Sequence, residues 1–356
     1  MNKVIILGNG FDLAHGLKTR YSDFILWYLN KVFTQINSQF LYQDDLIKLS
    51  RQGAIMPIAE FKYINDFIRT YNNEYTPITI EFKHSFFQKL IMSNADFNWV
   101  DIESMYYEEL KKLYSSTSPN TKKELKDLNK CFDLIKKELI EHLKQVDNTQ
   151  WNEDINSHLQ KTINETIARN KNTLADESRI LILNFNYTST IEMYLKDPKL
   201  ANLVSINYIH GNLKNEEKNP IIFGYGDEMD SHYEKIEQLN DNEFLSNFKS
   251  FWYLKTNNYR SLQSFLNSGS ILNNSFEVHV MGHSCGLSDR VLLNSIFEHS
   301  KCQSIKIYYY EKSKVDNDFF EKTQEISRHF KHSSKGRMRT IIVPFEESVP
   351  LTKHKG

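Results

Sequence analysis

The sequence predicts an α/β fold in which a Rossmann-like, mostly parallel sheet carries a large helical insertion. Three observations predict this fold. A short apolar run ends in a glycine turn close to the N-terminus, further apolar runs follow Arg179, and helical patterns lie between several of these runs. Strands that alternate with helices need crossover connections, which make neighbouring strands parallel. Because residues 24–175 keep a helical pattern, an insertion separates the first strand from the second.

The first strand is expected at Lys3–Leu7, where "KVIIL" is an uninterrupted run rich in β-branched residues. Such a run is typical of a strand that is buried on both faces. After the glycine turn, apolar residues recur at helical spacing between Tyr21 and Ile36, and again between Phe132 and Val146. Lysine and glutamate fill the polar side of the second helix, so we expect that side to face solvent.

The later strands are expected at short apolar runs such as "RILILNF" and "FEVHVMG". Helical patterns at Leu287–His299 and Val315–Phe330 lie between some of them, and a further helical piece covers residues 242–267. We therefore expect residues 1–23 and 176–356 to form the sheet domain and residues 24–175 to form the insertion. The expected strands are Arg179–Phe185, Val204–His210, Phe276–Gly282, Ser304–Tyr310 and Arg339–Phe345.

The composition argues against several classes of protein. Hydrophobic residues make up 40% of the 356 residues and the formal net charge is -1, which is typical of a folded chain. This charge gives no electrostatic signal for nucleic acid or for a membrane surface. The three cysteines are far apart, which argues against a disulfide framework or a zinc site. No apolar run has the length of a membrane helix or of a signal peptide, so we expect a cytoplasmic protein. From the cysteine spacing we also expect no metal site.

Polar residues and glycines follow several of the expected strands. In open parallel sheets, ligands bind at the carboxyl ends of the strands, and these ends meet at one edge if the strands are parallel. The strand ends read "GNGFD", "NFNYT", "HGN" (followed by "FGYGD") and "GHSCGLSD". The candidate site residues in these stretches are Gly8, Asn9, Gly10, Phe11, Asp12, Asn184, Asn186, Thr188, His210, Gly211, Gly224, Gly282, His283 and Ser284.

Each of these stretches has a structural and a functional interpretation. The glycines of "GNG" suit either a tight turn or a close approach of backbone N–H groups to a pyrophosphate. Leu13 stands where a dinucleotide fingerprint has its third glycine, and Asp12 suits a helix cap or a contact with a ribose hydroxyl. The asparagines of "NFNYT" suit local turn hydrogen bonds or a ribose contact. His210 is either a structural histidine or a general base.

The stretch "GHSCG" also matches G-x-S-x-G with a strand before it and a helix after it. This pattern is typical of a hydrolase whose nucleophile would be Ser284. Two observations argue against it. The acid and the histidine should follow the serine at later strand ends, whereas only His354 follows the last expected strand. The hydrolase reading also gives "GNGFD" and "NFNYT" no role.

These stretches, in this order, resemble the SIR2-like (sirtuin-type) NAD-binding superfamily. "GNGFD" stands where that superfamily has a Gly-Ala-Gly-Phe/Ile-Ser loop, and "NFNYT" stands where it has Thr-Gln-Asn-Ile-Asp. "IHG" and "GHS" match the catalytic histidine motif and the later Gly-x-Ser. The longer stretch "ILGNGFDLAHGLKTRYSDF" resembles the opening signature of the bacteriophage abortive-infection AbiH family. Asp12 and Thr188 depart from the Ser and Asp of the SIR2-like pattern, and the zinc-ribbon cysteines of deacylating sirtuins are absent.

The resemblance implies an antiphage protein that hydrolyses NAD⁺ to nicotinamide and ADP-ribose. It implies that Asn186 orients the ribose or the attacking water, that His210 accepts a proton, and that the glycine loops hold the phosphates and ribose. The helical insertion is then expected to sense a phage component or to build a homo-oligomer. Two alternatives stay open: a sensor that binds a nucleotide such as ADP-ribose without turnover, and the Ser284 hydrolase.

Overall fold

The computed structural model describes residues 1–53, 59–73, 75–93, 99–146, 150–171, 178–268 and 275–353. The chain divides into two compact units. The first, the sheet unit, comprises Met1–Leu17, Asn148–Asp230 and Phe248–Gly356. The second, the insertion unit, comprises Lys18–Asp147 and Ser231–Asn247.

The sheet unit contains a six-stranded sheet with the order β6-β5-β1-β7-β8-β9. Every pairing between these strands is parallel. The first strand therefore lies inside the sheet, between β5 and β7, which explains why all its residues are buried and why Val4–Leu7 are apolar. The expected α/β class and parallel sheet are confirmed. The strands are β1 (Asn2–Leu7), β5 (Ile180–Asn184), β6 (Val204–Tyr208), β7 (Phe276–Met281), β8 (Cys302–Tyr309) and β9 (Val349–Pro350).

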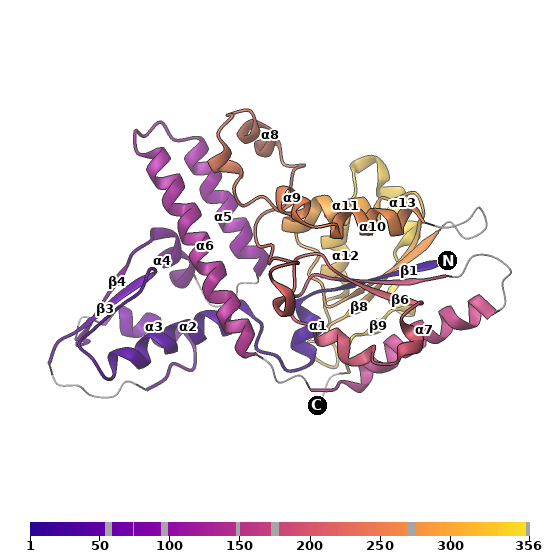
Figure 1. Cartoon of the computed structure of the whole chain (residues 1–356), viewed down its shortest axis with the longest axis horizontal. Helices are drawn as coiled ribbons and strands as arrows, with labels where there is room; N and C mark the ends of the chain where they lie inside the picture. Colours follow the sequence, from indigo (N-terminus) through magenta and orange to yellow (C-terminus); the bar gives the residue numbers. More distant parts are fainter. Residues whose placement is uncertain are drawn as a thin grey trace. The chain divides into compact units, whose positions relative to one another are not determined.

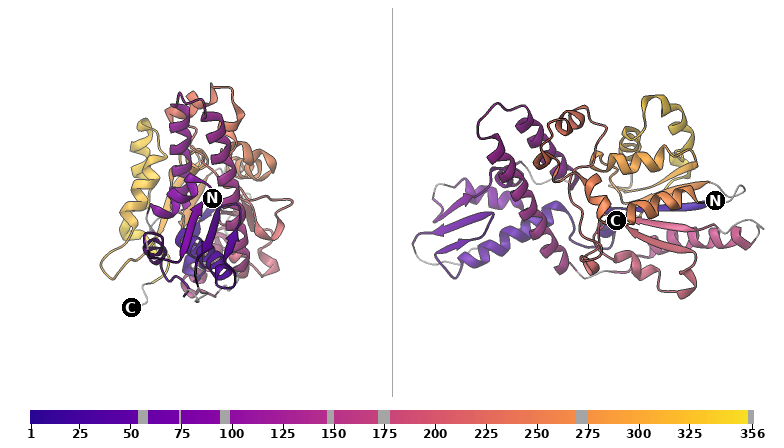
Figure 2. Two further views of the ribbon diagram at one scale, coloured as in Figure 1. Left: turned by 90° about the vertical axis from the view of Figure 1, so that its left-hand side faces the viewer. Right: turned by 45° about the horizontal axis from the view of Figure 1, so that its top comes forward.

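Helices cover both faces of this sheet (Figure 1). Val4 and Ile6 of β1 point to one face, where they join a core with α10, α11, α12 and α13. Ile5 and Leu7 point to the other face, where they join a core with α1 and α7. The right-hand view of Figure 2 shows α7, in pink, and the C-terminal helices, in yellow, on opposite sides of the strands. These helices are α1 (Asn9–Ala14), α7 (Glu153–Lys171), α10 (Asn258–Asn267), α11 (Arg290–Phe297), α12 (Phe319–Arg328) and α13 (Lys335–Ile341).

The insertion unit is built around α6, whose apolar stripe forms the core with neighbouring helices. Phe132, Ile135 and Leu139 of this helix are fully buried, as the helical spacing predicts. In the described part of the unit, α2, α4 and α5 contact α6. The helices are α2 (Tyr21–Ile36), α3 (Ile64–Tyr71), α4 (Ser85–Met92), α5 (Trp99–Tyr114), α6 (Thr121–Gln145) and α8 (Ser231–Glu237).

The expectation that residues 24–175 are helical throughout is wrong. The insertion unit also holds a three-stranded sheet with the order β2-β3-β4, in which both pairings are antiparallel. In β3, alternate residues are buried, so the strand has the two-residue period of a half-buried sheet. Segments this short do not stand out against the long helical patterns on either side. The strands are β2 (Leu41–Gln43), β3 (Ile47–Arg51) and β4 (Ile78–Phe82).

The expected strand at Arg339–Phe345 is also wrong. Its first part belongs to α13, which buries Met338 and Ile341 one helical turn apart. Only Ile342 pairs with the sheet, through a single bridge to Ile305, and the last strand is the short β9. A short apolar run cannot be assigned to a strand or to a buried helix from its periodicity alone.

The boundaries between the two units differ from those expected from the sequence, which lay after residue 23 and before residue 176. The helix α7 belongs to the sheet unit because its apolar side packs on β1 and β5. The helical piece at 242–267 is divided between the units. Its first part, the 3-10 helix η4 (Asn242–Leu245), lies in the insertion unit. Its other parts, α9 (Lys249–Trp252), η5 (Tyr253–Lys255) and α10, lie in the sheet unit.

Candidate functional site

The carboxyl ends of β1, β5, β6 and β7 lie side by side in the sheet unit. In the register of the sheet, Leu7 is level with Asn184 on one side and with Met281 on the other, and Asn184 is level with Tyr208. The polar residues that follow these positions therefore meet at one edge. This convergence, which the parallel strands predicted, is confirmed.

The glycines after β1 and β7 allow two loops to pack backbone against backbone. The N–H of Gly10 donates to the carbonyl oxygen of Gly282 over 2.8 Å. A Cβ atom on Gly8 would lie 2.5 Å from Cα of His283. Gly282 has a φ of +74°, and a Cβ atom there would overlap the backbone N of Phe11. The contact between the loops therefore accounts for these glycines without a ligand.

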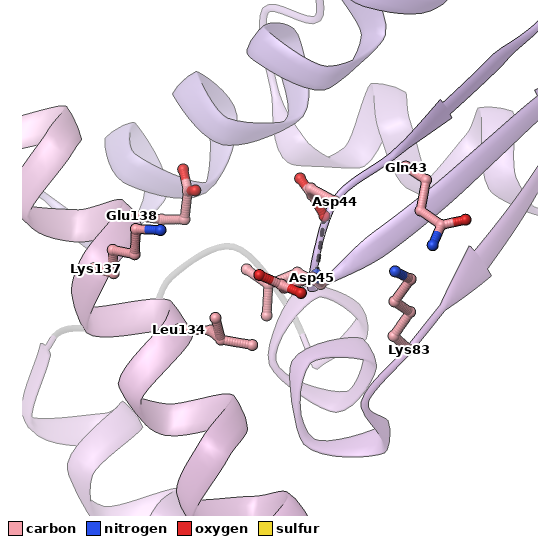
Figure 3. A pocket seen from close by; sticks show the side chains of 8 residues that line it. Gln43, Asp44, Asp45, Lys83, Leu134, Lys137 and Glu138 are labelled. Carbon is pink, nitrogen blue, oxygen red and sulfur yellow. Dashed lines mark hydrogen bonds between the residues drawn. The ribbon is translucent and has the colours of Figure 1, made fainter.

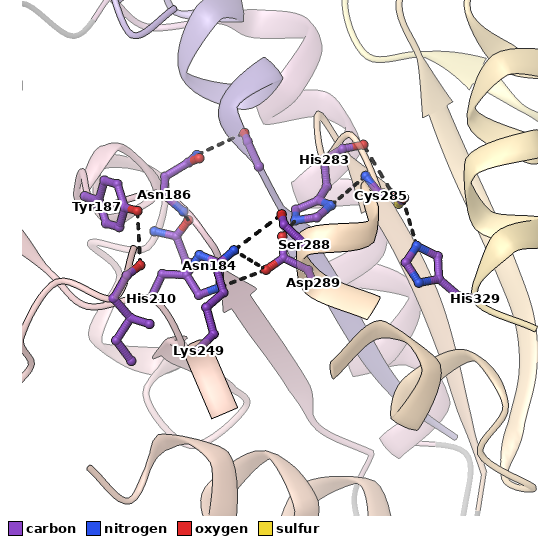
Figure 4. Close-up of polar contacts among 12 residues, drawn as sticks. Asn184, Asn186, Tyr187, His210, Lys249, His283, Cys285, Ser288, Asp289 and His329 are labelled. Carbon is purple, nitrogen blue, oxygen red and sulfur yellow. Dashed lines mark hydrogen bonds and ion pairs between the residues drawn. The ribbon is translucent and has the colours of Figure 1, made fainter. Parts of the chain in front are cut away.

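The amides after β5 form hydrogen bonds to the backbone (Figure 4). The Oδ1 of Asn184 accepts from the N–H of Asn186 over 3.0 Å, and its Nδ2 donates to the Thr188 carbonyl over 3.2 Å. These bonds shape the turn itself. The Nδ2 of Asn186 donates to the Gly8 carbonyl over 3.0 Å, which joins the loop after β5 to the loop after β1. Its Oδ1 has no hydrogen bond to any residue that the structure describes.

Asp12 and Thr188, the two departures from the SIR2-like pattern, contact each other. The hydroxyl of Thr188 donates to Oδ2 of Asp12 over 2.6 Å, and the hydroxyl of Thr190 donates to that of Thr188 over 3.2 Å. The pattern has a hydroxyl at the first position and a carboxyl at the second, whereas this chain has them the other way round. Asp12 is 2% exposed, and its Oδ1 has no partner within the described residues. Burial raises the pKa of Asp12 to about 6, although Thr188 and Thr190 oppose the rise.

Asp12 is expected to make stability fall as the pH rises from about 4 to about 6. Its pKa is 3.8 in an unfolded chain and about 6 in the fold, so the folded state holds an extra proton between these values. This contribution is present below the lower pKa and is lost above the upper one. Its size is about 3 kcal/mol. Urea unfolding of wild type and of Asp12→Asn across this range should give curves that diverge above pH 4, and parallel curves would contradict the assignment.

His210 lies within a buried charged cluster after β6. Its Nε2 lies 3.2 Å from Oδ1 of Asp289 and 3.1 Å from the hydroxyl of Tyr253. The Nζ of Lys249 lies 2.8 Å from the same Asp289 oxygen. Burial lowers the pKa of His210, although the Asp289 carboxylate opposes this. Burial alone would raise the pKa of Asp289, but Lys249 and the imidazoles hold it well below its ordinary value.

His283 is the second imidazole of this cluster. Its Nδ1 accepts from the N–H of Cys285 over 2.9 Å, so in the neutral ring Nε2 carries the proton. This Nε2 lies 3.7 Å from Oδ2 of Asp289. Burial lowers the pKa of His283 to about 3. Because both ring nitrogens are used or protonated, His283 is poorly suited to accept a proton. We call His210, Lys249, His283 and Asp289 the edge cluster (Figure 4).

The sequence pattern missed Lys249, Asp289 and Tyr253. Asp289 closes the stretch "GHSCGLSD", so its position after β7 was available as a signal. Lys249 stands in the aromatic stretch "FKSFW", where a charged side chain is unexpected. Nothing in the local pattern places either residue next to His210.

The remaining candidates have structural roles or lie at the margin of the cluster. Gly211 has a φ of +96°, and a Cβ atom there would overlap the carbonyl of Pro220. Gly224 precedes Tyr225, which pairs with Phe248 just before Lys249. Asn9 is the first residue of α1, and its side chain is partly buried.

The geometry around Ser284 does not form a nucleophile elbow. In an elbow the nucleophile itself occupies the strained turn. Here the positive φ belongs to Cys285, at 57°, whose carbonyl accepts from Nε2 of His329. The Nδ1 of the neighbouring His283 already accepts from the backbone. His354, the late histidine, lies outside the described residues.

A separate cavity of about 300 Å³ lies in the insertion unit (Figure 3). Asp44 and Glu138 in its lining already have polar partners. Asp44 accepts from the hydroxyls of Tyr28 and Tyr42, and Glu138 pairs with Lys31. Across the described residues, no group of histidine, cysteine and acidic side chains has the geometry to hold a metal ion. The cavity is lined by Gln43, Asp44, Asp45, Leu46, Lys83, Leu134, Lys137 and Glu138.

A scan against protein-family models matches residues 4–311 to the family described as bacteriophage abortive infection AbiH. The chain belongs to the AbiH family. The match covers the ends of β1, β5, β6 and β7 and the whole edge cluster, and it confirms the AbiH resemblance of the sequence. An AbiH chain has a role in abortive-infection defence against phage. Comparisons with curated proteins and with solved structures give no match. No helix in the described part of this AbiH chain has the length and apolarity that crossing a membrane requires.

Proposed function

We propose that this AbiH protein binds NAD⁺ at the carboxyl edge of its sheet and hydrolyses it during phage infection. The observation that carries the proposal is the pairing of His210 with Asp289. A carboxylate can only accept, so Nε2 of the neutral imidazole donates to Asp289. The lone pair then resides on Nδ1, which has no hydrogen bond to any described residue. A buried, neutral imidazole oriented by a carboxylate is suited to act as a general base.

The reaction needs a base and no general acid. In NAD⁺ the nicotinamide is already cationic, so it leaves with the electron pair of the C1′–N bond. The oxygen of water forms the new bond to C1′, and His210 accepts the proton that the water loses. The products are nicotinamide, ADP-ribose and a proton. General-base assistance of this kind contributes roughly 10²–10⁴-fold in rate.

Two acceptors at the same edge suit the hydroxyl groups of a ribose. The Oδ1 of Asp12 and the Oδ1 of Asn186 lack hydrogen-bond partners within the described residues. The Oδ1 of Asp12 is also buried, and a buried acceptor without a partner is costly, so a hydroxyl donor would remove that cost. We do not assign the phosphates to Gly8 and Gly10, because the N–H of Gly10 already donates to Gly282 and the N–H of Gly8 to Met281.

The burial of the edge cluster supports a resting state of low activity. His210, His283 and Asp289 are each at least nine-tenths buried, and so is the neighbouring Asn186. An unregulated NAD⁺ hydrolase would deplete the cell, so a closed site that opens on a trigger suits abortive infection. We propose that the trigger is a phage component or the assembly of a homo-oligomer, and that the insertion unit takes part.

His210→Ala should abolish the loss of NAD⁺ in phage-infected cells, with a fall in turnover of roughly 10²–10⁴-fold. Asn186→Ala should lower turnover as well. His332→Ala is the matched control, because His332 is exposed and lies outside the cluster. NAD⁺, nicotinamide and ADP-ribose are measured by mass spectrometry, with unfolding curves to verify the folded state. Wild-type NAD⁺ consumption by His210→Ala would refute the role of His210.

A sensor that binds without turnover is the second candidate. One observation favours it: the amide of Asn186 donates to the Gly8 carbonyl, so this group supports the backbone and is less free to orient water. Calorimetry with NAD⁺ and ADP-ribose, combined with mass spectrometry of the same samples, separates the two. Binding of ADP-ribose without nicotinamide release in triggered protein would favour the sensor.

A further inference from the structure

Lys249, Asp289 and His210 come from three separate segments of the sheet unit and meet at one oxygen atom. Lys249 begins α9, Asp289 ends the 3-10 helix η6 (Leu287–Asp289), and His210 follows β6. The Oδ1 of Asp289 lies 2.8 Å from Nζ of Lys249 and 3.2 Å from Nε2 of His210. Figure 4 shows both side chains directed at Asp289 from the same side.

The burial of Lys249 beside Asp289 carries a cost in folding free energy. Lys249 is 1% exposed, and a buried ammonium carries a large desolvation penalty. Replacing a buried ion pair by apolar residues of similar volume often leaves the stability of a protein unchanged or raises it. Its ammonium also approaches the hydroxyl of Ser288 at 3.5 Å, so the lysine is held in place by neighbouring residues.

We propose that Asp289 and Lys249 are positioning residues for His210, the first fixing the tautomer of the imidazole and the second keeping it neutral. This inference rests on the proposed function of the same site. Asp289 binds Nε2–H and leaves Nδ1 free as the base. The charge of Lys249 offsets that of Asp289, so the carboxylate orients the ring without converting it to imidazolium.

Within the described residues, the imidazole of His210 and the Asp289 carboxylate are surrounded by Lys249, His283 and Tyr253. The Asp289 carboxylate favours the protonated ring, whereas burial and the Lys249 ammonium disfavour it. His283 is neutral, because burial lowers its pKa to about 3, and Tyr253 places its hydroxyl 3.1 Å from Nε2 of His210. Lys249 and Asp289 therefore act on the pKa of His210 in opposite directions.

The test is a titration of His210 by NMR in full-length protein with isotope-labelled histidine. The His210 signal is assigned from its absence in His210→Gln. Lys249→Met should raise the pKa of His210 by about one unit or more, because the ammonium and the imidazole approach the same Asp289 oxygen and charges so near one another interact strongly at a protein's effective dielectric constant. Asp289→Asn should lower the pKa, and Lys249→Arg should keep it near the wild-type value.

The control is Lys255→Met, which removes an exposed lysine six positions further along the chain. It should leave the titration unchanged. If Lys249 and Asp289 have a purely structural role, Lys249→Met and Asp289→Asn should shift the pKa of His210 in the same direction or not at all. Either result would overturn the proposal. If Lys249→Met does not fold, the direction of the pKa shift of His210 in Asp289→Asn still tests the proposal. The titration needs no turnover, so a failure of NAD⁺ hydrolysis and a failure of this inference are distinguished.

Discussion

Gly282→Ala is expected to destabilise the sheet unit by about 3 kcal/mol or more. Two physical causes add. The backbone of Gly282 has a φ of +74°, which costs an alanine about 1 kcal/mol. The new Cβ atom would also overlap the backbone of Gly10 and Phe11, and backbone atoms at the end of a buried strand cannot move aside cheaply. The midpoint of urea unfolding should fall accordingly.

Gly16→Ala provides a matched control for the backbone term. Gly16 has a φ of +76°, almost the same as that of Gly282, but a Cβ atom there would meet nothing within 4 Å. Its substitution should therefore cost only the φ penalty of about 1 kcal/mol. The difference between the two variants measures the contact between the loops after β1 and β7. Equal losses for the two variants would mean that this contact does not require a glycine.

Asp289→Ala is expected to destabilise the protein by about 3–5 kcal/mol. Removal of the carboxylate leaves the ammonium of Lys249 buried without its closest anionic partner, which lies 2.8 Å away in wild type. The double variant Asp289→Ala/Lys249→Met removes both charges and should recover most of the loss. Chemical unfolding of the two single variants and the double variant gives the coupling energy directly.

The control for this cycle is Glu321→Ala. Glu321 pairs with Lys312 over 2.6 Å, but both side chains are largely exposed. An exposed pair is screened by solvent, so its loss should change stability far less than the loss of Asp289. If the double variant at Lys249 and Asp289 is no more stable than Asp289→Ala, the lysine charge is not the cause of the destabilisation.

The sequence was informative where local pattern and sheet geometry act together. The uninterrupted apolar run Val4–Leu7 marks β1 as an interior strand, and parallel pairing then requires the ends of β1, β5, β6 and β7 to share an edge. Together, the apolar run and the parallel pairing place Asp12, Asn186 and His210 at the same edge of the sheet. The helical spacing in α6 predicted its buried stripe for the same reason: the period repeats often enough to be clear.

The features that were missed depend on contacts between distant segments. The sequence left a tight turn and a phosphate-binding loop open for Gly8 and Gly10, whereas their neighbours in the fold are Gly282 and His283, which follow much later in the chain. The environment of Lys249 is set by Asp289, which is contributed by another loop. Short strands such as β3 lacked enough repeats for their period to be recognised.

The position of β1 in the middle of the sheet also determines when the sheet can be completed during synthesis of the chain. β1 leaves the ribosome before its partners β5 and β7, whose residues begin at Ile180 and Phe276. Strand pairs so far apart in the chain form late, whereas most of the insertion unit, Lys18–Asp147, is continuous and is made before either partner of β1. A nascent or prematurely terminated chain that lacks Asp289 has no carboxylate to orient His210. If the cluster is the active site, partial products of translation are harmless to the cell that makes them.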